Sequence, residues 1–175
     1  STKLENVAQY GVNTNPALTN FSNKYQIVSC LITSGTIMNL SIFEKVGPFE
    51  EKLFIDFVDV EYGLRCKHEG YLNVIYPSVL MCHSKGYVKL GRSLKNFKKT
   101  PRILHAPIRI YYMIRNGLFM YFKAKRIERK EIKLVLLEHA KMLKNDFIYH
   151  EQLASVYMNA IKGLIDFAID KMGKR

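Results

Sequence analysis

The residues of this chain that could do chemistry are concentrated in one short acidic run. Asp56, Asp59 and Glu61 fall within six positions of an otherwise apolar and aromatic stretch, and Arg65 follows four positions after the last acid. A carboxylate among apolar side chains is costly to bury unless it is paired or takes part in a reaction. The run is therefore a candidate site, and the chemistry it would offer is proton transfer by a carboxylate.

A structural interpretation explains part of this run. Asp56 can serve as the N-cap of a helix, Asp59 can lie in the first turn where the helix dipole favours an acid, and Glu61 can pair with Arg65 at i,i+4. Gly70 would then close the helix. Capping and pairing are sufficient explanations for Asp56, Glu61 and Arg65.

Asp59 is harder to explain by capping alone. Its neighbours Phe57, Val58 and Val60 are apolar, so its carboxylate would be desolvated on one side. Amide donors at the start of the helix would hold it ionised on the other side. This arrangement is typical of a general base.

The elements that must position the run begin before it. An apolar stretch over 27–32 predicts a strand, and a turn containing Ser34 and Gly35 follows it. The sequence Ser41 to Glu44 forms a capping box for a short helix that ends at Gly47.

Two short buried strands are expected after the run, over 71–76 and 79–82, with a break at Pro77. His83 falls where the second strand ends. A histidine there can be a structural residue, or it can be a ligand at the strand end where α/β folds place their sites. Both interpretations of His83 are open. Further along, apolar periodicity predicts helices over 106–122, 131–143 and 147–172.

In this order, the segments resemble the family-two glycosyltransferases of the GT-A fold, and within them the bacterial rhamnosyltransferase-like group. The resemblance runs from about residue 27 to the C-terminus. It is carried by Thr33-Ser34-Gly35, Val46-Gly47-Pro48-Phe49, residues 53–61, Leu64-Arg65, Glu69-Gly70-Tyr71, His83-Ser84, Tyr111-Tyr112, Arg115-Asn116, Gly163-Leu164-Ile165-Asp166 and Met172-Gly173-Lys174.

The resemblance implies an inverting sugar transfer with Asp59 as the catalytic base. Asp59 would deprotonate an acceptor hydroxyl as that oxygen attacks the anomeric carbon of a nucleotide-activated sugar. Val58 stands where the family usually has a glutamate, as it does in the rhamnosyltransferase-like group. Asp56 or Glu61 would then supply the missing charge.

The resemblance also implies roles for the residues around Asp59. His83 would contact the divalent cation or the leaving diphosphate, and Arg115 and Asn116 would contact a diphosphate or the acceptor. A guanidinium offers a two-pronged fork to phosphate, although helix packing also explains Arg115. The acceptor side would be lined by Ser34, Gly35, Asp56, Glu61 and Arg65.

The nucleotide-binding half of a GT-A enzyme, which ends in an Asp-x-Asp metal motif, is not found in this sequence. We therefore expect an α/β fragment: a connector over 1–26, the acceptor-side half of the catalytic domain over 27–104, and a helical C-terminal appendage over 105–175. Such a fragment should be inactive alone, and Mg²⁺ or Mn²⁺ should be held mainly by the missing half. Its open sheet edge should be covered by self-association or by an N-terminal partner.

Positive charge is the other strong signal in the sequence. Residues 85–133 hold fifteen Lys and Arg against two acids, whereas the rest of the chain carries a net charge of −1. Basic residues beside aromatic ones suit an anionic membrane surface, a polyprenyl-diphosphate-linked glycan acceptor or nucleic acid. Nucleic acid is disfavoured because zinc-finger spacing, RNP-type strands and basic-zipper heptads are missing.

No run reaches the length of about 18 apolar residues that spans a bilayer. We therefore expect a cytoplasmic enzyme of surface-polysaccharide synthesis, peripheral at the inner face of the plasma membrane. The alternative is a non-catalytic module that binds a membrane or a partner through the basic segment, with the acids near Asp59 acting as caps.

Overall fold

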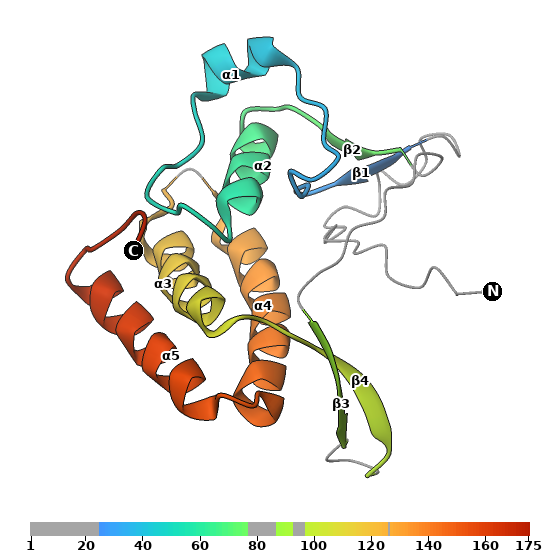
Figure 1. The fold of residues 1–175 in the computed structure, drawn as a ribbon. Helices are drawn as coiled ribbons and strands as arrows, with labels where there is room; N and C mark the ends of the chain where they lie inside the picture. The colour runs from blue at the N-terminus through green and yellow to red at the C-terminus, as the bar shows by residue number, and fades with distance from the viewer. Residues whose placement is uncertain (1–24, 77–86, 93–96, 126) are drawn as a thin grey trace.

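The computed structural model describes residues 25–76, 87–92, 97–125 and 127–175. Over these residues the chain is mixed α/β, with five helices and two small antiparallel sheets (Figure 1). The predicted class, a few short strands followed by a mostly helical C-terminal segment, is confirmed at this level. The assignment to the GT-A fold stays a prediction.

The first sheet pairs β1 (Gln26–Val28) with β2 (Asn73–Ile75), and Ile27 lies opposite Val74. Both strands are shorter than the apolar stretches that predicted them. Within the described ranges each strand pairs only with the other, so each has one edge without a strand neighbour. The predicted strand over 79–82 lies outside the described residues.

Helix α1 (Leu40–Val46) precedes the acidic run. It begins one residue before the predicted capping box, because Asn39 is the N-cap and its side chain accepts a 3.0 Å hydrogen bond from the Ser41 N–H. The prediction that Ser41 caps this helix, as part of a capping box with Glu44, was therefore wrong. The predicted end at Gly47 is confirmed, and its φ of 88° lies in the region that favours glycine.

Helix α2 (Val58–His68) carries the acidic run, with Asp59 in its first turn as predicted. The N-cap is Phe57 rather than Asp56, which corrects the first of the capping assignments. At the other end Gly70 has a φ of 86° and donates to Lys67 O, while the Tyr71 N–H donates to Cys66 O. This paired closure confirms that Gly70 ends the helix.

Three helices follow: α3 (Pro107–Lys123), α4 (Arg129–Tyr149) and α5 (Leu153–Ala168). The sequence predicted all three, although α4 is longer and α5 shorter than expected. Helices α3 and α5 approach closely at Gly163, where an added Cβ would lie 2.7 Å from Tyr111 O. A side chain at this position would push the two helices apart.

An antiparallel hairpin of β3 (Tyr87–Arg92) and β4 (Lys99–Leu104) was not predicted. Strand β4 packs beside the C-terminal part of α4, and the far end of the hairpin points away from the helices (Figure 1). Leu104 and Gly91 are buried on one side of the hairpin, and an added Cβ at Gly91 would lie 2.8 Å from the Tyr149 ring. The opposite side of the hairpin is exposed.

The largest apolar cluster joins α2 to α3 and α4. Its fully enclosed members include Leu53, Phe57 and Leu64 from the acidic-run side, packed with Met120 and Ile132. This core therefore contains residues from both sides of the predicted 104/105 division, and the division itself stays a prediction. None of the helices in the described ranges is long and apolar enough to cross a membrane.

Candidate functional site

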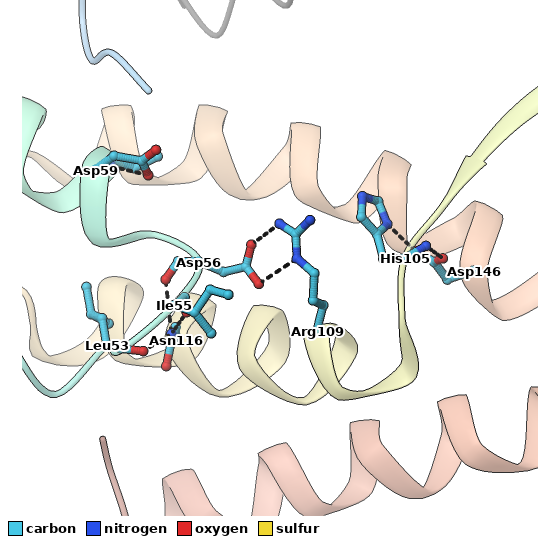
Figure 2. A network of polar contacts seen from close by, with 9 residues as sticks. Leu53, Ile55, Asp56, Asp59, His105, Arg109, Asn116 and Asp146 are labelled. Atoms are coloured by element: carbon cyan, nitrogen blue, oxygen red, sulfur yellow. Dashed lines mark hydrogen bonds and ion pairs between the residues drawn. The ribbon is translucent and has the colours of Figure 1, made fainter. Parts of the chain in front are cut away.

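The loop that leads into α2 is held by a buried asparagine on α3. Asn116 is fully enclosed, and its Nδ2 donates to Leu53 O at 2.8 Å, Ile55 O at 2.7 Å and Asp56 O at 3.0 Å. Figure 2 shows Asn116 reaching from α3 to this loop. One side chain thus satisfies three main-chain carbonyls and fixes the path of the chain just before Asp59.

Arg115, beside it, completes this support. Each of its five N–H groups has an acceptor within the chain: Asn116 Oδ1, the Tyr111 hydroxyl, Gly173 O, Lys52 O and Leu53 O. The guanidinium is buried and also lies over the rings of Tyr111 and Tyr112. The predicted diphosphate contact of Arg115 and Asn116 would compete with these bonds. These bonds let both residues position the loop, and their predicted contact with a diphosphate or the acceptor stays a prediction.

The held loop has an unusual backbone. Phe54, Asp56 and Phe57 have φ values of 60°, 59° and 68°, all in the left-handed region that bulky side chains rarely adopt. Such residues persist only where their surroundings hold them, and they are concentrated at functional sites. The bonds from Asn116 and Arg115 are the surroundings that hold this loop.

Asp56 forms an ion pair that the sequence analysis missed. Both of its carboxylate oxygens accept from Arg109 of α3, with Nε 3.2 Å from Oδ2, and the Asp56 side chain is nearly enclosed (Figure 2). The N-cap assignment for Asp56 was wrong because Phe57 turns into the left-handed region and directs Asp56 toward α3. Arg109 and Asn116 are seven positions apart, so they share a face of α3, and both contact this loop.

Glu61 and Arg65 form the predicted i,i+4 pair. The pair is buried and two-pronged, with Nε to Oε1 and Nη2 to Oε2 both at 2.9 Å. Arg65 also donates to Val46 O at 2.7 Å and to Pro48 O at 2.8 Å. The pair therefore ties the end of α1 to α2, and its proposed place on an acceptor surface stays a prediction.

Asp59 differs from both of these acids. It is half-buried in the first turn of α2, and its Oδ1 accepts a 2.9 Å hydrogen bond from the Val60 N–H. Within the described part of the chain its carboxylate pairs with no lysine, arginine or histidine. Asp59 is thus a carboxylate that is oriented by a helix start and keeps an oxygen available for a proton.

Two buried groups share the environment of Asp59. The His139 ring of α4 stacks on Phe57 with 4.1 Å between ring centroids, and its Nδ1 lies 2.9 Å from Val135 O. Burial lowers the pKa of His139, while that hydrogen bond and the charges of Asp56 and Asp59 act in the opposite direction. Burial, with the charges of Asp59 and Glu131, raises the pKa of the Cys30 thiol to about 12. Sequence reasoning gave no signal for His139.

The remaining predicted residues lie elsewhere. Ser34 and Gly35 are exposed in a turn closed by a 3.1 Å hydrogen bond from the Thr36 N–H to Thr33 O. His83 lies outside the described residues, so its predicted distance from Asp59 is not tested. In the described ranges no group of three His, Cys, Asp or Glu side chains is placed to hold a metal ion.

A second polar network joins the hairpin to the helices. Asp146 of α4 is fully enclosed; it accepts from the His105 N–H at 2.8 Å and lies 2.9 Å from His105 Nδ1 (Figure 2). His150 Nε2 lies 2.8 Å from the Tyr87 hydroxyl and 3.1 Å from His105 O. These contacts fix the junction of β4 and α3, which precedes Arg109.

Comparison with known proteins gives one informative match. The chain is 38% identical over 95 residues to the dTDP-rhamnosyl transferase RfbF of Shigella flexneri. The matched segment is 54% of this chain and 30% of that protein, so the chain corresponds to less than a third of the relative's length. No family model and no solved structure matches the chain.

Proposed function

We propose that this chain is the acceptor-side part of an inverting glycosyltransferase of the GT-A type, with Asp59 as the general base. The observation that carries the proposal is the difference among the three acids. Asp56 and Glu61 are neutralised by Arg109 and Arg65, whereas Asp59 is oriented but has no cationic partner within the described ranges. The similarity to a dTDP-rhamnosyl transferase supports the same class of reaction.

In the proposed reaction, Asp59 removes the proton of an acceptor hydroxyl while that oxygen bonds to the anomeric carbon of the donor sugar. The bond from the anomeric carbon to the diphosphate breaks, and the nucleoside diphosphate leaves with the electron pair. Attack from the opposite side inverts the anomeric centre. Asn116 and Arg115 position the loop before Asp59.

The proposed donor is a nucleotide sugar, with dTDP-rhamnose as the first candidate because of the relative's name. The proposed acceptor is a growing surface polysaccharide or a polyprenyl-diphosphate-linked glycan. A divalent cation, Mg²⁺ or Mn²⁺, held mainly by a nucleotide-binding half, is proposed as the cofactor. We assign no step of this chain to the cation.

The test is a transfer assay with a panel of nucleotide sugars and Mg²⁺ or Mn²⁺. It compares this chain with a version that includes any coding sequence preceding it in the gene. Transfer by the longer version, lost in its Asp59→Asn variant, supports the proposal. Failure of every donor in both versions would favour the alternative, a non-catalytic module that binds through its basic segment.

A further inference from the structure

We propose that the outward face of the β3–β4 hairpin docks on an anionic lipid surface. This inference goes beyond the proposed glycosyl transfer and does not depend on it. The sequence placed an excess of positive charge over residues 85–133. The structure places two of those cations, Arg92 and Lys99, on the same face as exposed aliphatic residues of one element.

The two faces of the hairpin differ sharply. On the inward face, Lys89 pairs with Glu151 at 3.2 Å and Arg102 lies over the Tyr149 ring, so α4 and the start of the following turn cover it. Leu104 at the base of this face is completely enclosed. The inward face is therefore occupied by the protein itself.

The outward face is apolar near its base. Val88 pairs with Ile103 and Leu90 with Pro101 across the strands, which places all four on the same side of the hairpin. Val88 and Leu90 are 66% and 65% exposed. Exposing aliphatic pairs to water to this extent is unfavourable in free energy. No second layer of the protein covers this face of the two-stranded hairpin.

The same face becomes cationic at the other end of the paired strands. The next pair outward is Arg92 opposite Lys99, and both are exposed. Phe97, 77% exposed, and Lys98 directly precede β4 in the chain. From Tyr87 to Leu104 the sequence contains six Lys and Arg and no acid.

A lipid surface fits this combination better than the other candidate occupants. Aliphatic and aromatic side chains can enter the boundary between headgroups and acyl chains while cations contact anionic headgroups. Nucleic acid would use the cations, but it would leave Val88, Leu90 and Ile103 without a role because aliphatic groups do not stack on bases. A second copy would bring its own net charge of +12 to the contact.

The test measures partition of the chain onto phosphatidylcholine vesicles with and without phosphatidylglycerol, by sedimentation. Wild type should bind only the anionic vesicles. R92Q/K99Q should weaken binding about 25-fold, from roughly fivefold for each cation near an anionic surface. V88S/L90S should weaken binding at least tenfold. The matched control K133Q/K144Q removes two exposed lysines of α4 and should change binding less than about threefold.

A second measurement places the contact. The chain contains no tryptophan, so Phe97→Trp adds a single indole to the hairpin. Its emission should shift to the blue when anionic vesicles are added. The inference is overturned if the emission does not move, or if the hairpin variants bind like wild type while I161S/I165S, on the exposed apolar side of α5, abolishes binding. It is also overturned if V88S/L90S changes the oligomeric state instead.

Discussion

Replacing Asn116 by alanine is the most direct test of how the acidic loop is held. Asn116 is fully enclosed, donates to Leu53 O, Ile55 O and Asp56 O, and accepts from Arg115 Nε. Alanine would remove the Asn116 donor from Ile55 O and Asp56 O and the acceptor from one guanidinium N–H in the interior, while Leu53 O keeps its bonds from Arg115 Nη2 and the Ile55 N–H. Each unsatisfied buried group costs about 1–3 kcal/mol, and partial relaxation reduces the sum. We expect a loss of about 3–5 kcal/mol in the free energy of unfolding.

The assays are urea unfolding and thermal unfolding, both followed by far-ultraviolet circular dichroism. For a chain of this size, that loss corresponds to a fall in Tm of about 6–20 °C. Asn145→Ala is the matched control, because Asn145 also lies inside a helix, is half-buried and has a side chain without a hydrogen-bond partner in the described ranges. The control should change stability by less than about 0.5 kcal/mol. A loss below about 1 kcal/mol for Asn116→Ala would refute the role assigned to Asn116.

Three further results are expected. Asp56→Asn should cost about 1–3 kcal/mol, and a double-mutant cycle with Arg109→Gln should show coupling; additive losses would contradict the ion pair. Burial lowers the pKa of His139 below its ordinary value of about 6.5. The free energy of unfolding should therefore be highest above about pH 6.5 and decrease as the pH drops below that value. His139→Gln should flatten this pH dependence in urea titrations. An unchanged slope would refute that assignment. A pKa of about 12 leaves about one in ten thousand Cys30 thiols ionised at pH 8, so peptide mass spectrometry should find Cys30 alkylated only after unfolding.

The elements that the sequence predicted well are those with a local signal. The helices α3, α4 and α5 follow apolar stripes at helical spacing, and Gly47 and Gly70 end their helices because the chain needs a left-handed residue there. The Glu61–Arg65 pair lies within one helix at i,i+4, so its geometry was fixed by spacing alone.

The hairpin was missed because its pattern is reversed. Its apolar residues Val88 and Leu90 face outward, while Lys89 and Gly91 face α4, where Glu151 and the Tyr149 ring meet them. A rule that places apolar side chains inside cannot find such an element. The reversal is itself the basis of the proposed lipid contact.

The site was predicted only in part for a related reason. Asp56 had a local explanation as an N-cap, but its partner Arg109 lies 53 positions away. The contacts of Asn116 and Arg115 with the loop also join segments about 60 positions apart. Spacing within one element could not reveal these long-range contacts, and His139 reaches Phe57 from yet another helix.

The central claim concerns Asp59, and one measurement tests it most directly. Initial rates of sugar transfer should be compared for wild type, Asp59→Asn and the exposed-loop control Glu51→Gln in the longest form of the protein that transfers sugar. Loss of a general base predicts a fall in kcat of about a hundredfold or more for Asp59→Asn, with donor binding and folding stability retained. Glu51→Gln should match wild type. Equal turnover by Asp59→Asn and wild type would contradict the account and leave Asp59 as a residue that only stabilises the start of α2.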